Sequence, residues 1–174
     1  MKNHQSHTNS VPLAELGQVL VDKSAWAAII SCARNEGAKH EVGGILLGLR
    51  RGKYLHVTAA TLPGLRDRSS RIWFLRFDRI HQIAAVRKWL VSGFKVDWIG
   101  EWHSHPEVSP KPSLVDIQTW QSQANKRRAP MVYVILGLEG FWVGRMEQGS
   151  AGPYELELAE ESDTSLLFQV ADYA

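Results

Sequence analysis

One segment near the middle of the chain constrains the fold more than any other, because a strand signal, several prolines and a helix signal follow one another within it. Residues 95–100 are apolar and β-branched enough to form a strand. Ser113 stands where a helix N-cap belongs, so we expect a helix over residues 114–124. The loop between these elements contains three prolines, Pro106, Pro110 and Pro112. Proline continues neither element, so the segment predicts a strand and a helix joined by an extended loop.

Polar side chains stand at both ends of that loop. His103 and His105 are two residues apart at the end of the strand, so both project from one face, with Cα atoms roughly 6.5–7 Å apart. Trp102 alternates to the other face and should pack behind them. Asp116, in the first turn of the helix, can reach back toward the strand. Two imidazoles and a carboxylate match the three protein ligands of a catalytic zinc site, whose fourth position is held by water.

Two further residues suit the chemistry of a metallo-hydrolase. The Ser113 hydroxyl could donate to an oxyanion, and a carboxylate could act as general base. Glu41, in the upstream run EVGGILLG, is one candidate for that base. Glu101 is the competing candidate, because it shares the parity of His103 and His105 on the predicted strand. Glu101 could equally be a salt-bridge partner behind the ligands.

Each of these residues also has an ordinary structural explanation. A His-x-His pair can simply lie on a protein surface. Ser113 and Asp116 have the spacing of a helix capping box, which needs no function and is compatible with one. Glu41 could be an exposed carboxylate between a helix and a strand. Taken singly, these alternatives stay open, and only the joint spacing is specific.

The joint spacing resembles the signature of the JAMM (MPN-plus, or JAB) zinc metalloprotease family. That signature is an upstream Glu, then His-x-His-Pro, with seven residues between the second His and a Ser-x-x-Asp. Residues 106–112 supply those seven positions here, so the spacing matches without a gap. The resemblance spans roughly residues 20–145, and the short chain is most similar to the stand-alone prokaryotic JAB proteins.

The resemblance implies a role for each residue of the signature. His103, His105 and Asp116 would bind Zn²⁺. Glu41 would be the general acid and base, which gives it preference over Glu101, and Ser113 would stabilise the oxyanion. Every position of the signature is intact, so nothing points to the inactive scaffold branch of the family.

The resemblance also implies an activity. We expect a zinc-dependent isopeptidase or peptidase that hydrolyses the amide bond after the C-terminal tail of a ubiquitin-like or small carrier protein. Its setting would be a bacterial conjugation or anti-phage system with conjugating-enzyme-like partners. Two alternatives are a non-proteolytic MPN scaffold and a DNA-repair-associated JAB-like protein. The complete signature argues against the scaffold. A formal net charge of only +2, without a strong basic stripe, argues against nucleic acid.

Composition places the chain among single-domain proteins of the cytoplasm. Its 174 residues, 44% of them hydrophobic, suffice for one sizeable core. The single cysteine, Cys32, cannot form an internal disulfide. We expect no signal peptide, because residues 1–12 are polar, and no membrane span, because no run of about 18 apolar residues occurs.

Apolar periodicity predicts alternating helices and strands along the rest of the chain. We expect helices over 24–38 and 78–92, and strands over 42–49, 54–62, 71–77, 131–138, 141–147 and 154–158. In helix 78–92, one apolar stripe includes Ile80, Ile83 and Leu90. The order predicts an α/β domain with a mixed β-sheet flanked by helices, and the resemblance implies the deaminase-like MPN fold.

We divide the chain into a disordered leader (1–12), a catalytic domain (13–160) and a C-terminal tail (161–174). The tail contains four large apolar residues, Leu166, Leu167, Phe168 and Val170. We expect these side chains to be exposed, and therefore able to dock on a partner or on the domain itself.

Overall fold

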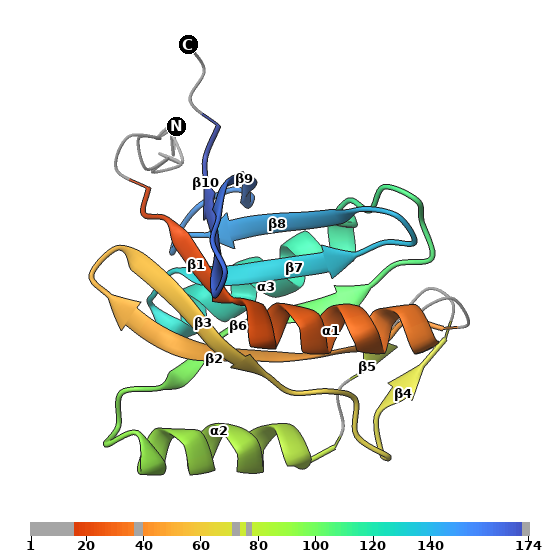
Figure 1. The fold of residues 1–174 in the computed structure, drawn as a ribbon, viewed down its shortest axis with the longest axis horizontal. Helices are drawn as coiled ribbons and strands as arrows, with labels where there is room; N and C mark the ends of the chain where they lie inside the picture. Colours follow the sequence, from red (N-terminus) through yellow and green to blue (C-terminus); the bar gives the residue numbers. More distant parts are fainter. Residues whose placement is uncertain (1–15, 37–39, 71–73, 76–77, 172–174) are drawn as a thin grey trace, which may run out of the picture.

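A computed structural model describes residues 16–36, 40–70, 74–75 and 78–171. Eight strands close into a barrel in the order β1-β10-β9-β8-β7-β6-β2-β3, with β3 returning to β1 (Figure 1). The barrel strands are β1 (Val19–Asp22), β2 (Gly43–Arg51), β3 (Tyr54–Ala60), β6 (Asp97–Ser104), β7 (Met131–Leu136), β8 (Phe141–Met146), β9 (Tyr154–Glu161) and β10 (Ser165–Gln169). Two pairs, β1 with β3 and β6 with β7, are parallel, and the others are antiparallel.

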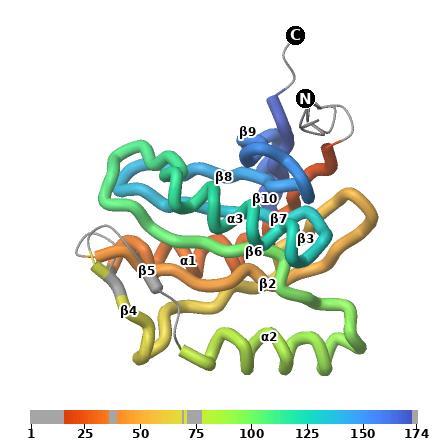
Figure 2. Tube along the Cα trace, turned by 180° about the vertical axis from the view of Figure 1, so that it is seen from behind, coloured from red at the N-terminus to blue at the C-terminus, as the bar shows by residue number. Residues whose placement is uncertain are grey.

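Three helices and one small sheet complete the described part of the chain. The helices are α1 (Lys23–Glu36), α2 (Ile80–Val91) and α3 (Leu114–Arg127), and a two-stranded sheet joins β4 (Arg68–Ser69) to β5 (Phe74–Leu75). Helices α1 and α3 lie on opposite sides of the barrel wall, while α2 lies below it (Figures 1 and 2). None of the helices described is long and apolar enough to cross a membrane.

The mixed α/β composition is confirmed, but the expectation of a flanked sheet needs correction, because the sheet closes into a barrel. Closure depends on β1 and β10, two short strands that the periodicity did not reveal. They pair with each other, and β1 also pairs with β3 while β10 pairs with β9.

The C-terminal segment is part of the barrel rather than an exposed tail. Leu166 and Phe168 alternate inward from β10 and are only 5% and 0% exposed, while Leu167 and Val170 are half-buried. The expected exposure of these side chains is therefore wrong. Strand β9 runs across the boundary drawn between residues 160 and 161, and β10 lies within the segment expected to be a tail. The leader, residues 1–12, lies outside the described residues.

Strand β7 separates two hydrophobic clusters, because successive side chains point to opposite faces. Its even-numbered residues, Val132, Val134 and Leu136, join the cluster that α1 covers. Its odd-numbered residues, Met131, Tyr133 and Ile135, join the cluster that α3 covers. All six are buried, so helices must cover both sides of this strand.

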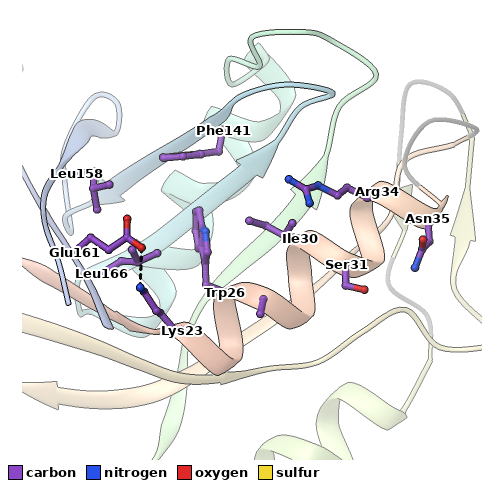
Figure 3. A pocket seen from close by; sticks show the side chains of 11 residues that line it. Lys23, Trp26, Ile30, Ser31, Arg34, Asn35, Phe141, Leu158, Glu161 and Leu166 are labelled. Atoms are coloured by element: carbon purple, nitrogen blue, oxygen red, sulfur yellow. Dashed lines mark ion pairs between the residues drawn. The ribbon is translucent and has the colours of Figure 1, made fainter. Parts of the chain in front are cut away.

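Helix α1 lies along one end of β8 and the β9–β10 pair. The Trp26 ring meets Phe141 edge-on, with centroids 5.1 Å apart, and lies 5.6 Å from Phe168. A groove of about 610 Å³ remains between these elements, and an ion pair between Lys23 and Glu161 spans one end of it at 2.7 Å (Figure 3).

Candidate metal centre

Strand β6 carries His103 to one end of the barrel, and His105 follows directly after its last residue. The His105 amide donates to the Leu136 carbonyl at 2.9 Å, which continues the parallel pairing with β7. Between the two histidines, Ser104 is turned the other way, and its hydroxyl accepts a hydrogen bond from the Val42 amide at 3.0 Å. The Ser104 amide in turn donates to the Val42 carbonyl at 2.8 Å. The end of β6 is thereby tied to the residue that follows Glu41.

Trp102 packs behind this histidine pair, as its parity predicts. The side chain is 1% exposed, and its indole N–H donates to the Thr61 carbonyl at 2.9 Å. Gly44 is paired with Trp102 across β2 and β6. A Cβ at Gly44 would lie 2.1 Å from the Thr61 carbonyl oxygen, so only glycine allows β2 to approach this closely.

Helix α3 begins with the predicted capping box. The Ser113 amide and hydroxyl donate to Asp116 Oδ2 at 2.8 and 2.6 Å, and the Asp116 amide donates to Ser113 Oγ at 3.2 Å. One turn later, Trp120 stacks on Tyr133 and Trp142, with centroids 4.3 and 5.5 Å apart. The cap orients the Asp116 carboxylate, and the stacked rings hold the helix against the barrel.

Three potential ligand atoms converge at the junction of β6 and α3. The Nε2 atoms of His103 and His105 lie 3.0 Å apart, Asp116 Oδ1 lies 3.4 Å from His103 Nε2, and Asp116 Oδ2 lies 3.7 Å from His105 Nε2. Tetrahedral bonds of ~2.0–2.1 Å would separate ligand atoms by ~3.3–3.4 Å. The observed separations bracket that value, so the three residues can hold one metal ion.

The titration of His103 also suits metal binding. Burial lowers its pKa to about 4, and the neighbouring His105 acts in the same direction, while Asp116 opposes them. The His103 ring is therefore neutral at pH 7. A neutral imidazole offers a lone pair to a metal, whereas an imidazolium does not.

Glu41 lies in the segment that leads into β2, two residues before Gly43. Its Oε1 atom lies 4.0 Å from His105 Nε2, the residue is 7% exposed, and its amide donates to the Ser70 carbonyl at 2.8 Å. Burial, together with the charges of Asp116 and Glu107, raises the pKa of the Glu41 carboxyl to about 7. Such a carboxyl can exchange a proton near neutral pH.

The competing carboxylate, Glu101, lies two residues before His103 on β6. It is half-buried on β6, opposite Ile45 of β2 and Tyr133 of β7, and is not a member of the three-residue ligand cluster. Sequence reasoning missed the contribution of Glu107, whose negative charge helps to raise the pKa of Glu41. Its position two residues after His105 was the available signal.

The raised pKa of Glu41 predicts a pH-dependent stability of the metal-free protein. Its folded pKa of about 7 exceeds the ordinary 4.5, so the folded state loses stability as pH rises from about 4.5 through 7. Replacing Glu41 with Gln should remove this loss. We expect the chelator-treated variant to be about 1–3 kcal/mol more stable than wild type at pH 8, with the difference vanishing near pH 4.

Urea unfolding of both chelator-treated proteins at the two pH values measures that difference. An equal difference at pH 4 and pH 8 would show that the Glu41 proton does not cause it.

A closed barrel that presents two imidazoles, an aspartate and a buried glutamate at one end defines a metallo-hydrolase type of site. The chain belongs to the family described as prokaryotic homologs of the JAB domain, which it matches over residues 22–147. Family membership confirms the resemblance drawn from the signature.

Proteins named CD-NTase/cGAS isopeptidase are among the relatives. Those of Pseudomonas aeruginosa and Escherichia coli are each 35% identical over 105 residues, 59% and 60% of this chain, and the Vibrio cholerae protein is 33% identical over 108 residues, 62% of this chain. The matched regions cover 66%, 67% and 69% of these relatives. This chain therefore matches about two thirds of their length.

A solution structure of a Desulfitobacterium hafniense protein shares the fold. Its TM-score is 0.57 at 22% identity, and the match covers 82% of this chain and 94% of that one. At this identity the likeness concerns the fold alone.

Proposed function

We propose that this protein is a zinc-dependent isopeptidase of the bacterial CD-NTase system, which hydrolyses the amide bond joining a CD-NTase tail to another protein. The observation that carries the proposal is the convergence of Glu41 on the cluster of His103, His105 and Asp116. The name shared by the relatives supports both the reaction and the substrate. The CD-NTase takes the place of the ubiquitin-like or small carrier protein expected from the sequence.

His103, His105 and Asp116 would hold the zinc ion. When bound, zinc supplies Lewis acidity and lowers the pKa of water from 15.7 to about 7. Asp116 can serve as a ligand without losing its orientation, because the Ser113 amide and hydroxyl hold its carboxylate.

Glu41 moves the proton in the proposed reaction. Its carboxylate removes a proton from the attacking water as the new C–O bond forms at the scissile carbonyl. It then returns that proton to the amine nitrogen as the C–N bond breaks. The products are a carboxylic acid and an amine, which become a carboxylate and an ammonium ion by proton exchange at neutral pH. In the metal-free protein, burial and the charges of Asp116 and Glu107 raise the pKa of this carboxyl to about 7, which favours a group able to take up and return a proton.

Ser113 would stabilise the oxyanion. Its hydroxyl now donates to Asp116 at 2.6 Å, and rotation about the Cβ–Oγ bond could redirect the proton toward the carbonyl oxygen while Oγ still accepts from the Asp116 amide. The hydroxyl therefore combines the cap with a part in the reaction.

A pair of substitutions separates these two roles of Ser113. Asn is as good an N-cap as Ser but places no hydroxyl there, so Ser113→Asn should lower kcat about 10²-fold with stability near that of wild type. Ser113→Ala should lower kcat similarly and also cost about 1 kcal/mol of stability. Single-turnover kinetics and thermal unfolding measure the two effects. Full activity of Ser113→Asn would remove the hydroxyl from the reaction.

A fusion substrate tests the proposed function. The zinc-loaded protein should cut a CD-NTase carrying a reporter on its C-terminus at the junction, and should spare a fusion whose last ten tail residues are replaced by Gly-Ser repeats. Ubiquitin and small sulfur-carrier fusions serve as parallel substrates. Cleavage of those alone would overturn the CD-NTase assignment, and cleavage of none would overturn the peptidase.

A further inference from the structure

Helix α2 is attached to the barrel through its first turn. His81 is 2% exposed, and its Nδ1 and Nε2 atoms contact Thr61 Oγ1 at 2.6 Å and Asp67 Oδ2 at 2.8 Å. The Ile80 amide donates to Asp78 Oδ1 at 3.0 Å. These contacts hold the beginning of the helix and leave its opposite face pointing away from the barrel.

The outward face of α2 is apolar. The exposed fractions are 50% for Ile80, 64% for Ile83, 55% for Val86, 56% for Leu90 and 76% for Val91. We call these five residues the outer face of α2. No described segment lies over it (Figures 1 and 2). A shallow groove of about 770 Å³ runs along it beside Gln82 and Arg87.

This arrangement is unusual for an amphipathic helix, whose apolar stripe normally covers a core. Contiguous exposed apolar side chains of this kind mark interaction surfaces in soluble proteins. The spacing of Ile83, Val86 and Leu90 forms a ridge on one side of the helix, which suits packing against another helix.

The charges around the outer face specify the chemistry of the partner. Residues 79–96 contain no Asp or Glu, and their four formally charged residues are all basic: Arg79, Arg87, Lys88 and Lys95. All four are exposed, and Arg87 lines the groove itself. A matching partner presents apolar side chains flanked by carboxylates.

A second copy of this chain fits poorly. Pairing two α2 helices about a two-fold axis would bring Arg87 and Lys88 of each copy near the same residues of the other. The acidic strand β9, with Glu155, Glu157, Glu160 and Glu161, has the required charge. Docking β9 of one copy on α2 of the next would leave one surface of each kind free and build an open chain.

We propose that the outer face of α2 binds an amphipathic helix of another protein, with an apolar stripe flanked by Asp or Glu. Such helix-in-groove recognition uses apolar anchors at helical spacing for affinity and flanking charges for orientation. The site is separate from the metal centre and does not depend on the peptidase activity.

A designed peptide probes this surface directly. The probe is a fluorescein-labelled 18-residue amphipathic helix with a Leu stripe flanked by Glu, and a second version carries Lys at every Glu position. Fluorescence anisotropy should show binding of the Glu peptide to wild type. Val86→Ser/Leu90→Ser should weaken that binding about tenfold or more. The control Leu158→Ser removes an exposed apolar residue of β9 and should leave the affinity unchanged.

Charge reversal tests the partner's chemistry. Arg87→Glu/Lys88→Glu should weaken binding of the Glu peptide and strengthen binding of the Lys peptide. No binding of the Glu peptide to wild type, or binding insensitive to both double variants, would overturn the proposal. So would sedimentation showing a wild-type dimer that Val86→Ser/Leu90→Ser converts to monomers, because the occupant would then be a second copy. Thermal unfolding checks that these variants, all at exposed residues, remain folded.

Discussion

Glu41→Gln should abolish most turnover while the protein still binds one zinc ion per chain. Gln occupies nearly the same volume but cannot accept the proton of the attacking water, so we expect kcat to fall by about 10²–10⁴-fold. Zinc should remain, because Glu41 lies outside the cluster of His103, His105 and Asp116. Cleavage kinetics on the CD-NTase fusion and elemental mass spectrometry measure the two properties.

Glu101→Gln is the matched control for that experiment. Glu41 Oε1 lies 4.0 Å from His105 Nε2, whereas Glu101 lies on β6 opposite Ile45 and Tyr133. Glu101→Gln should therefore keep kcat within a few-fold of wild type. If Glu101→Gln lost activity and Glu41→Gln did not, the base would be Glu101.

Removing two of the three proposed ligands should eliminate metal binding altogether. His103→Ala/Asp116→Ala leaves only His105 at the site, which cannot hold zinc against solvent. We expect about one zinc ion per chain in wild type, none in the variant, and no detectable cleavage by the variant. Zinc should also raise the Tm of wild type, because a ligand that binds only the folded state stabilises it by about 2.7 kcal/mol at 100 times its Kd.

The control for this double variant must separate metal binding from the helix cap. Asp116 also completes the capping box of α3, and losing a cap costs about 0.5–2 kcal/mol. His103→Ala alone keeps that box, so it should lose the zinc-dependent rise in Tm without losing the helix cap. A wild-type protein that stays metal-free after zinc is supplied would remove the basis of the catalytic proposal and favour the scaffold alternative.

The local features of the site could be predicted because they depend on short-range geometry. Two histidines separated by one residue share a strand face, which also sends Trp102 into the core. The capping box of Ser113 and Asp116 is a contact within one helical turn. The family assignment followed from the same spacing and is confirmed by the match over residues 22–147.

Other features depend on pairings between distant segments. Glu41 approaches His105 only because β2 and β6 pair in a register that places Gly43 opposite His103. The sequence contains no periodicity from which that register could be calculated. The pKa of Glu41 depends in turn on burial and on the charges of Asp116 and Glu107, which only this pairing brings together.

The sequence by itself determined the helices, the signature, its spacing and the alternation of the strand that bears the histidines, because these depend on residues close along the chain. Tertiary structure alone decided that the sheet closes. Strands β1 and β10 are only four and five residues long, too short for a reliable pattern, and become strands by pairing with each other and with their neighbours. Tertiary structure also decided that the apolar stripe of α2 points outward. The spacing of apolar residues along a helix predicts a stripe, but whether the stripe is buried depends on what surrounds the helix.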